Sequence, residues 1–397
     1  MINPVSCFRC TIPVRWMALS LIVLCLVVAC GLTCSAAALN ISAPSAILVE
    51  AHTGQILFEK DIDTPRPPAS MTKIMTMLLV MEALERGQIS LDDVVVTSEY
   101  AARMGGTQIW LAAGEEMSVR DLLKSVAIAS ANDAAVALAE HVSGAAEVFV
   151  DRMNKRAAEL GATNTHFVNP TGLPKGDGGP ENMASARDIA LMSMELLKYP
   201  MVLEYTSTWI DQVRGGNPVL NNTNRLVRYY DGCDGIKTGY IDASKHCMSA
   251  TAMRDNLRLI SVVMGASTSN ERYDDTRKLL DYGFANYQAI PVAKAGQVVG
   301  DLEISRGEYE TVSVAPKADL TVVIGKSESP EVETELVFPE RVVAPIAEGQ
   351  LVGKLRVTKD GREIGSVDLI ALQEVRKGNP IKLFFRSVKN LFGMVFR

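Results

Sequence analysis

The sequence is poor in histidine throughout and poor in cysteine after its first 34 residues. Five of the seven cysteines precede residue 35, which leaves only Cys233 and Cys247 in the rest of the chain. The four histidines are scattered and none belongs to an H-E-x-x-H pattern, so a metalloprotease site is unsupported. The histidines are His52, His141, His166 and His246. We therefore predict no metal and no cofactor.

Two other catalytic signatures and one class of partner are also missing. There is no G-x-S-x-G elbow, although spacing alone does not exclude a Ser-His-Asp triad. Gly325-Lys326-Ser327 resembles the end of a phosphate loop, but Leu320 stands where that motif needs glycine. The formal net charge is -6, whereas nucleic-acid-binding proteins usually carry a basic surplus. We expect no nucleic-acid partner.

The first 38 residues have the pattern of an export signal. Arg9 and Arg15 precede an apolar run over residues 16–30, and small residues at Ala36 and Ala38 suit signal peptidase. We expect cleavage after Ala38 and an exported protein. Two alternatives are a retained membrane anchor and a weak lipoprotein site at residues 28–30.

Cys233 and Cys247 lie on either side of Lys237. If the segment between them forms a hairpin that turns near Tyr240, the two thiols could face each other. A disulfide is then conceivable outside the cell. The alternative is two buried free thiols, because a disulfide requires closely spaced Cα atoms.

Residues 39–289 predict an α+β domain in which a helical cluster packs on an antiparallel sheet. Apolar runs bounded by turn residues indicate strands, and apolar residues at three- and four-residue spacing indicate helices. The strands come from both ends of this segment. We expect strands at 47–50, 55–58, 235–240, 246–253 and 258–264, and helices at 70–84, 119–129, 133–144, 145–160 and 185–197.

Residues 290–375 have a different pattern of short, β-branched strands. The clearest hairpin signal is Asp360-Gly361, because Asp-Gly suits a tight type I′ turn. The segment contains neither histidine nor cysteine. We interpret it as a small all-β domain without chemistry of its own.

The final segment, 376–397, contains six Lys or Arg residues and no Asp or Glu. Its apolar residues recur at helical spacing opposite a basic face, which predicts an amphipathic helix on an anionic membrane surface. Such a helix is too short and too charged to span a bilayer. The alternative is a helix that docks on the protein itself. We expect residues 380–397 to hold the chain peripherally at the outer face of the cytoplasmic membrane.

Three short motifs occur in order along the predicted catalytic domain, and each alone is common by chance. Lys73 follows Ser70 by one helical turn, so both side chains share a helix face. A serine hydroxyl needs a base to become nucleophilic, and a buried lysine beside another cation can be neutral enough to serve. The motifs are Ser70-Met71-Thr72-Lys73, Ser130-Ala131-Asn132 and Lys237-Thr238-Gly239.

The three motifs resemble the S-x-x-K, S-x-N and K-T-G motifs of the penicillin-recognising serine transpeptidases and carboxypeptidases. Longer stretches narrow the resemblance to the D-alanyl-D-alanine carboxypeptidases, which are low-molecular-mass penicillin-binding proteins of peptidase family S11. The order of parts also fits: signal peptide, β-lactamase/transpeptidase-like catalytic domain, small β domain and amphipathic helix. Departures are Ala131 within the second motif and a loop, Glu181-Asn182-Met183-Ala184-Ser185, to which we assign no role. The longer stretches are residues 68–73, 130–134, 167–173 and 232–239.

The resemblance implies removal of the terminal D-alanine from peptidoglycan stem peptides through an acyl-enzyme on Ser70, with β-lactams acylating the same serine. Lys73 would be the base, Ser130 would relay a proton to the leaving amine, and Asn132 would hold the peptide. The backbone N–H groups of Ser70 and Tyr240 would form the oxyanion hole.

The third motif and one arginine would bind the substrate's end. Lys237 would supply positive charge, Thr238 would bind a carboxylate, and Gly239 would leave room for the substrate strand. Arg272 matches a family arginine and either helps to bind the carboxylate or forms a surface salt bridge.

Three other functions remain open from the sequence. An endopeptidase that cleaves cross-links would share the same motifs. A class A β-lactamase would need a Glu-x-x-Leu-Asn loop between the second and third motifs, and none is present. A non-catalytic wall scaffold would not need intact motifs.

Overall fold

The structure is a computed structural model that describes residues 39–174, 178–179 and 181–381. The predicted signal peptide, 1–38, lies outside the described residues, and so does the amphipathic helix beyond Ile381. All the elements below belong to the compact unit that begins at Ile41. No helix among the described residues is long and apolar enough to cross a membrane.

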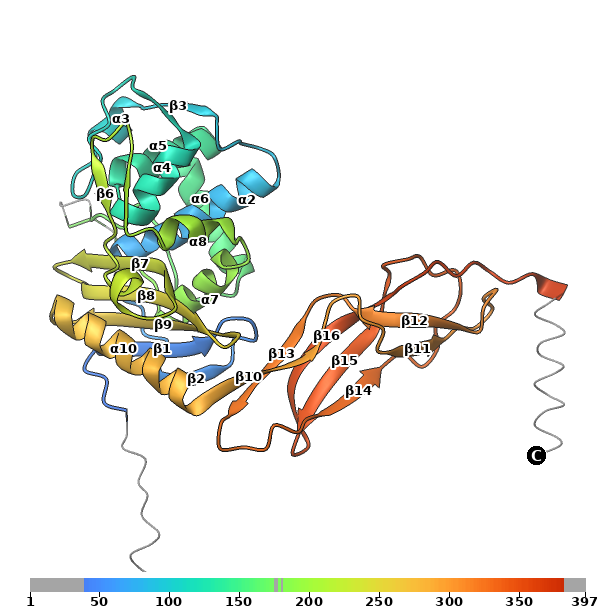
Figure 1. The fold of residues 1–397 in the computed structure, drawn as a ribbon. Coiled ribbons are helices and arrows are strands. Elements are labelled where there is room, and N and C mark those ends of the chain that lie inside the picture. The colour runs from blue at the N-terminus through green and yellow to red at the C-terminus, as the bar shows by residue number, and fades with distance from the viewer. Residues whose placement is uncertain (1–38, 175–177, 180, 382–397) are drawn as a thin grey trace, which may run out of the picture. The chain divides into compact units, whose positions relative to one another are not determined.

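A five-stranded antiparallel sheet forms the centre of the first domain, in the order β2-β1-β9-β8-β7. As predicted, its strands come from both ends of the segment. Helix α10 (Ser269–Asn286) covers one face of the sheet and the helical cluster covers the other (Figure 1). Strand β7 is an edge strand, so its outer side is free to pair with an extended ligand. The strands are β1 (Ser45–Glu50), β2 (Ile56–Lys60), β7 (Cys233–Ile241), β8 (Lys245–Arg254) and β9 (Leu257–Ala266).

Helix α2 (Lys73–Glu85) is the central helix of the cluster. Its residues from Lys73 to Ala83 are all buried, which explains why the segment is apolar on every side. A 3₁₀ turn, η1 (Ala69–Thr72), precedes it. The other helices are α3 (Glu99–Ala102), α4 (Val119–Lys124), α5 (Asn132–Ser143), α6 (Ala146–Glu159), α7 (Ala186–Leu196), α8 (Met201–Thr206) and α9 (Leu226–Tyr229).

One helix of the cluster differs in detail from the prediction. The helix expected over 119–129 is α-helical only to Lys124 and continues as a π-helical turn, η2 (Ser125–Ala129). Ser118 Oγ accepts a hydrogen bond from Asp121 N and so caps the start of α4. Helix α5 ends at Gly144, whose φ of 80° provides the left-handed cap.

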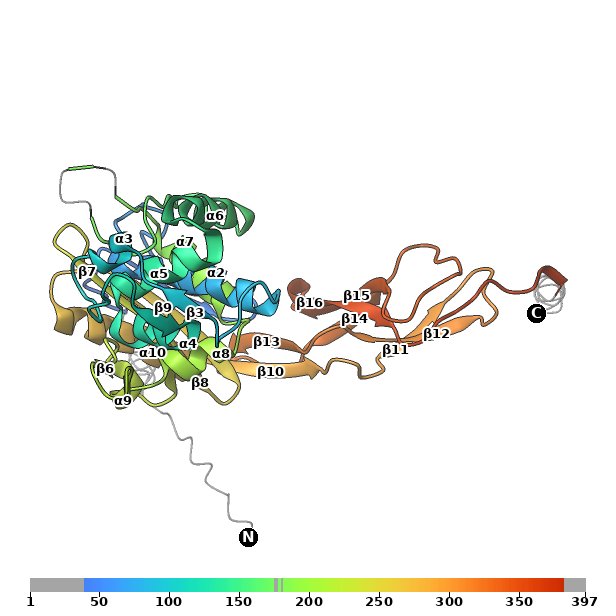
Figure 2. The same ribbon diagram turned by 90° about the horizontal axis from the view of Figure 1, so that it is seen from above.

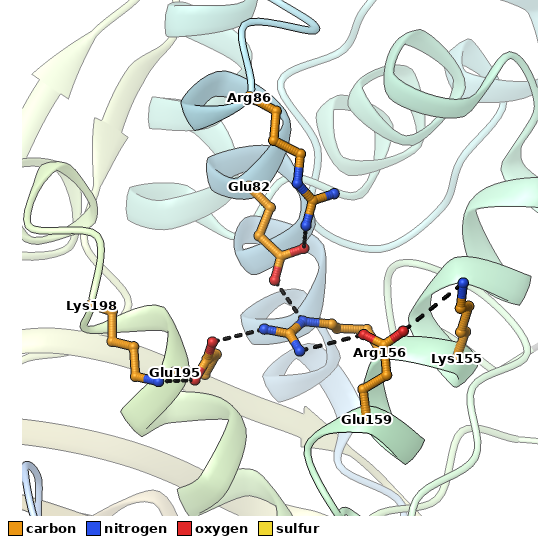
Figure 3. A network of polar contacts seen from close by, with 7 residues as sticks. All are labelled: Glu82, Arg86, Lys155, Arg156, Glu159, Glu195 and Lys198. Carbon is orange, nitrogen blue, oxygen red and sulfur yellow. Dashed lines mark hydrogen bonds and ion pairs between the residues drawn. The ribbon is translucent and has the colours of Figure 1, made fainter. Parts of the chain in front are cut away.

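An ion-pair network joins three helices of the cluster (Figure 3). Arg156 of α6 donates from Nε to Glu82 of α2 at 2.6 Å and from Nη2 to Glu195 of α7 at 2.7 Å. Glu82 is buried, and Arg86 also donates to it at 3.1 Å. A buried carboxylate is tolerated only when it is paired in this way. The network therefore fixes the far end of α2 relative to α6 and α7.

Two small hairpins complete this domain. They pair β3 (Val94–Val96) with β4 (Glu116–Ser118) and β5 (Ile210–Gln212) with β6 (Val219–Asn221). The β5–β6 hairpin leads directly into Thr223, which lies in the site described below.

The region after α10 is all β, as predicted. Strand β10 lies beside β13 (Figure 1 and Figure 2), and the other five form a sheet in the order β11-β12-β16-β15-β14. Asp360 and Gly361 have φ values of 49° and 74° and join β15 to β16, as a type I′ turn requires. The strands are β10 (Tyr287–Ala293), β11 (Gly300–Glu303), β12 (Thr311–Pro316), β13 (Leu320–Gly325), β14 (Glu333–Val337), β15 (Leu351–Lys359) and β16 (Arg362–Ala371).

Cys233 and Cys247 do not form a disulfide; both are buried and free. The register of the β7–β8 hairpin places Cys233 opposite Ala252 and Cys247 opposite Gly239. The two thiols therefore lie at opposite ends of the hairpin and not across it. Burial also raises the pKa of the Cys233 thiol to about 12, so it is unreactive.

Candidate active site

The first two motif residues meet at the start of α2. Ser70 lies in the η1 turn and is half-buried, whereas Lys73 is the first residue of α2 and is fully buried. The Lys73 Nζ lies 3.0 Å from Ser70 Oγ, 2.7 Å from Asn132 Oδ1 and 2.9 Å from the carbonyl oxygen of Thr171. The first and second motifs are thus joined directly through this amine.

Lys73 lies in surroundings that favour its neutral form. Burial lowers its pKa well below the usual lysine value, and the charge of Lys237 lowers it further. Asp133 acts in the opposite direction but does not bond to Lys73; its carboxylate accepts from the backbone N–H groups of Ile109 and Leu111. No carboxylate among the described residues bonds to the Lys73 amine.

The partners of Lys73 determine where its lone pair points. The Thr171 carbonyl can only accept, and Asn132 also presents an oxygen, because its Nδ2 donates to Gly105 O at 2.7 Å. A neutral amine has two N–H groups, and these two acceptors use both of them. The remaining lone pair is then directed at Ser70 Oγ, which is the geometry that a general base requires.

Ser130 follows the π-helical turn η2 and has a φ of 67°. Its Oγ is buried and has no hydrogen-bond partner in the described part of the chain. A buried hydroxyl without a partner usually costs free energy, so such a group often marks a site where a ligand completes the bonding. The side chain is available to pass a proton.

Lys237 is the second buried amine of the site. Burial, and then the charge of Arg272, lower the pKa of Lys237 to about 7. Its Nζ donates at 3.2 Å to the carbonyl of Thr238. An ammonium group whose one hydrogen bond to the described residues is this weak backbone contact can readily donate to an anionic ligand.

The other two residues of the third motif contact neighbouring segments. Thr238 Oγ1 donates at 2.8 Å to Thr223 Oγ1, and the Thr223 carbonyl accepts from Tyr273 at 2.8 Å. A Cβ atom on Gly239 would lie 2.7 Å from the carbonyl oxygen of Pro68. Glycine at this position therefore also allows η1, and with it Ser70, to approach β7 closely.

Arg272 lies beside β7 and is only 6% exposed. Its guanidinium donates weakly to the carbonyls of Gly239 and Cys247 at 3.5 and 3.4 Å and to Ser269 Oγ at 3.2 Å. Among the described residues no carboxylate pairs with it, so the surface salt bridge considered from sequence is not formed. A buried guanidinium without a counter-ion is a strong attractor for an anion.

The structure thus brings the predicted residues into one site and adds two that sequence reasoning missed. Lys73 joins Ser70 to Asn132, while β7 carries Lys237, Thr238, Gly239 and Tyr240, with Arg272 packed beside it. The additions are the Thr171 carbonyl and Thr223. Thr171 lies in a stretch noted only for its family resemblance, and no sequence signal marked Thr223.

Comparisons with known proteins agree with this arrangement. The sequence model of the D-alanyl-D-alanine carboxypeptidase family, peptidase S11, matches residues 32–268. The model of the penicillin-binding protein 5 C-terminal domain matches residues 287–377. The D-alanyl-D-alanine carboxypeptidase DacF of Bacillus subtilis is 43% identical over 350 residues, which is 87% of this chain and 89% of the relative.

Solved structures show the same similarity. Penicillin-binding protein 5 from Haemophilus influenzae is 32% identical with a TM-score of 0.73, over 85% of this chain and 98% of its own. Penicillin-binding protein D2 from Listeria monocytogenes, solved in an ampicillin-bound form, is 33% identical with a TM-score of 0.57, over 62% of this chain and 98% of its own. The chain belongs to the D-alanyl-D-alanine carboxypeptidase family, the S11 serine peptidases.

Proposed function

We propose that this enzyme removes the terminal D-alanine from peptidoglycan stem peptides through an acyl-enzyme on Ser70. The observation that carries the proposal is the position of the Lys73 Nζ, within hydrogen-bond distance of Ser70 Oγ, Asn132 Oδ1 and the Thr171 carbonyl. In the neutral amine the last two oxygens engage both N–H groups, so the lone pair faces Ser70 Oγ. In acylation, Lys73 takes the proton of Ser70 while the oxygen attacks the carbonyl between the two D-alanines. The resulting oxyanion accepts bonds from the backbone N–H groups of Ser70 and Tyr240.

The second half of acylation needs a proton for the departing amine of D-alanine. Ser130 Oγ is buried, has no partner in the described part of the chain and follows directly after the η2 turn. It gives its proton to the amine as the peptide bond breaks and takes the proton that Lys73 removed from Ser70, which leaves an ester on Ser70, free D-alanine and a neutral Lys73. Water then attacks the ester while Lys73 removes its proton, and Lys73 returns that proton to Ser70 Oγ as the ester bond breaks and the shortened peptide leaves.

Recognition of the substrate's C-terminal carboxylate fits the cationic end of the site. Lys237 and Arg272 are both buried, and no carboxylate in the described part of the chain pairs with either. Thr238 adds a neutral donor, because its hydroxyl, which donates to Thr223 Oγ1 here, can turn to a substrate carboxylate. A free carboxylate is what distinguishes the end of a stem peptide from its interior, so this end of the site selects for carboxypeptidase action.

β-Lactams would acylate the same serine, since they present a reactive carbonyl and a carboxylate to these groups. A second candidate is D,D-endopeptidase action on cross-links. It is favoured by one relative, the D-alanyl-D-alanine endopeptidase of Escherichia coli, which is 31% identical over 60% of this chain. The β-lactamase and scaffold alternatives have no comparable support.

The test is D-alanine release from a soluble peptide that ends in Lys-D-Ala-D-Ala, measured beside cleavage of a purified cross-linked muropeptide dimer. A carboxypeptidase releases one D-alanine per peptide and leaves the dimer largely intact. Cleavage of the dimer without release from the linear peptide would replace the proposal by the endopeptidase. Penicillin labelling with neither product would contradict both.

The dependence of activity on pH should have a falling limb set by Lys237. Its pKa of about 7 in the free enzyme is below its usual value, so its charge is present below pH 7 and is lost as the pH rises. We expect kcat/KM for the peptide to fall above about pH 7, chiefly through a higher KM. Lys237→Arg keeps its charge at every working pH, and its kcat/KM should be lower at the maximum but without the falling limb. An unchanged limb in that variant would assign the limb to another group.

We also propose an exported enzyme bound peripherally to the outer face of the cytoplasmic membrane through residues 380–397. The support is the sequence: an apolar face that includes Phe384, Phe385 and Phe392, opposite a basic face. Deleting residues 380–397 should move most of the enzyme from the membrane fraction to the soluble fraction and leave kcat/KM on a soluble peptide unchanged. Retention in the membrane fraction would place the anchor at the N-terminal segment instead.

A further inference from the structure

Asn182 belongs to the loop at residues 181–185, to which no role was assigned from the sequence. It is only 3% exposed and uses its whole bonding capacity. Its Nδ2 donates to Thr72 Oγ1 at 2.9 Å and to the carbonyl of Asn169 at 3.0 Å. Its Oδ1 accepts from the backbone N–H groups of Val168 and Asn169 at 2.7 and 3.1 Å. The side chain therefore joins the loop to the residue that immediately precedes Lys73.

Asn169 continues the connection toward Lys73. Its Oδ1 accepts from the N–H and the hydroxyl of Thr171, both at 3.0 Å, and from Gly172 N at 2.7 Å. Its Nδ2 donates to the carbonyl of Leu173 at 3.0 Å. These bonds fix the turn at Thr171, whose carbonyl is the 2.9 Å acceptor of Lys73.

The turn is pressed closely against the segment that carries the nucleophile. Gly172 has a φ of +77°, and a Cβ atom there would lie 1.9 Å from the carbonyl oxygen of Ala69. Thr76 Oγ1, one turn after Lys73, donates at 2.7 Å to the carbonyl of Pro170. Lys73 and Thr76 are therefore bonded to the turn itself, and Thr72 is bonded to Asn182, which holds the turn through Asn169.

We propose that Asn182 is a positioning residue for the general base: together with Asn169 it holds the Thr171 carbonyl against Lys73, so that the deprotonated amine directs its lone pair at Ser70. The inference rests on the proposed function of Lys73 as the base. Without the fixed carbonyl, one N–H of the neutral amine is free to turn toward Ser70, and the lone pair then points elsewhere. Asn182 does not touch the reacting atoms and acts only through Lys73.

Loss of this arrangement should also change how readily Lys73 gives up its proton. The charged groups that act on Lys73 are Lys237 of β7, which lowers its pKa, and Asp133 of α5, which raises it. The loop contributes only the neutral carbonyl of Thr171. If the turn loosens, water reaches the amine, the effect of burial weakens, and the pKa of Lys73 rises toward its usual value.

The test is the second-order rate constant for acylation by a fluorescent penicillin, measured against pH on the full chain and corrected for the fraction of folded protein. Asn182→Ala should lower the rate at neutral pH by about 10- to 100-fold. The acylation rate should rise with pH as Lys73 loses its proton, and Asn182→Ala should move this rising limb of the pH–rate profile to higher pH. The matched control is Asn154→Ala, because Asn154 bonds both the N–H and the carbonyl of Phe167 at 2.8 Å in the same segment but does not hydrogen-bond to Thr72 or Thr171. It should lower Tm without moving the limb.

Thr72→Val provides a second test if Asn182→Ala does not fold. It removes the acceptor of Asn182 Nδ2 and nearly preserves the shape of the side chain, and we expect a shift of the limb in the same direction. A uniform loss of rate at every pH, with an unmoved limb in both variants, would show that Asn182 is merely structural. Penicillin acylation needs no D-alanine release, so failure of the carboxypeptidase proposal would be seen separately, in the peptide assay.

Discussion

Ser70→Ala should abolish both D-alanine release and covalent labelling by penicillin, with a fall in kcat/KM of about 10⁴-fold or more. Ser70 Oγ is the hydroxyl that bonds to the Lys73 amine. Removing it leaves the base with no nucleophile to activate. Ser70 is half-buried at the edge of the η1 turn, so the loss of one hydroxyl should change Tm by only a few degrees.

The matched control for this prediction is the second serine of the site. Ser130 Oγ has no partner in the described part of the chain, and in the proposed mechanism it only relays a proton. Ser130→Ala should therefore still be labelled by penicillin, but more slowly, whereas Ser70→Ala should not be labelled at all. Mass spectrometry of the labelled peptide would locate the ester. Labelling on a peptide that contains Ser130, or labelling that persists in Ser70→Ala, would assign the nucleophile elsewhere.

The sequence could predict those parts of the fold that depend on local pattern. The strands around Leu48, Ser249 and Val262 are buried on both faces, and buried strands appear in the sequence as continuous apolar runs. Asp360-Gly361 predicted its hairpin because these two residue types readily adopt the positive φ angles of a type I′ turn. The π-helical turn before Ser130 could not be predicted, because a change from α to π hydrogen bonding leaves the apolar spacing almost unchanged.

The same difference between local pattern and long-range contacts explains which parts of the site could be predicted from the sequence. Ser70 and Lys73 are close because they are one turn apart in the sequence, so their spacing predicts their contact. Asn182 bonds to Thr72 across 110 positions, and the Thr171 group that meets Lys73 is a backbone carbonyl, which every residue possesses. Such contacts arise only when the chain has folded. The sequence left open whether Cys233 and Cys247 pair for a similar reason, because the register of the β7–β8 hairpin decides which residues are opposite each other.

Lys73 variants should produce the second large effect and test the base directly. Lys73→Met removes the amine and should slow acylation by penicillin about 10³-fold, within the range expected for loss of a general base. It also leaves Asn132 Oδ1 and the Thr171 carbonyl without their donor, and each unpaired acceptor costs about 1–3 kcal/mol of stability. The removal of a buried amine offsets part of that cost, so we expect the variant to fold.

Lys73→Arg separates the base from the charge. A guanidinium keeps a positive charge and several N–H donors for Asn132 and Thr171, but it does not lose its proton at any working pH. If Lys73 acted only as a cation that stabilises the oxyanion, Lys73→Arg would keep most of the activity. Because we assign Lys73 a neutral, proton-accepting role, we expect Lys73→Arg to be nearly as slow as Lys73→Met. Small amines such as methylamine should partly restore acylation in Lys73→Ala, in proportion to the unprotonated amine present. Activity retained in Lys73→Arg, or rescue that follows the protonated amine, would contradict the general-base role on which the mechanism depends.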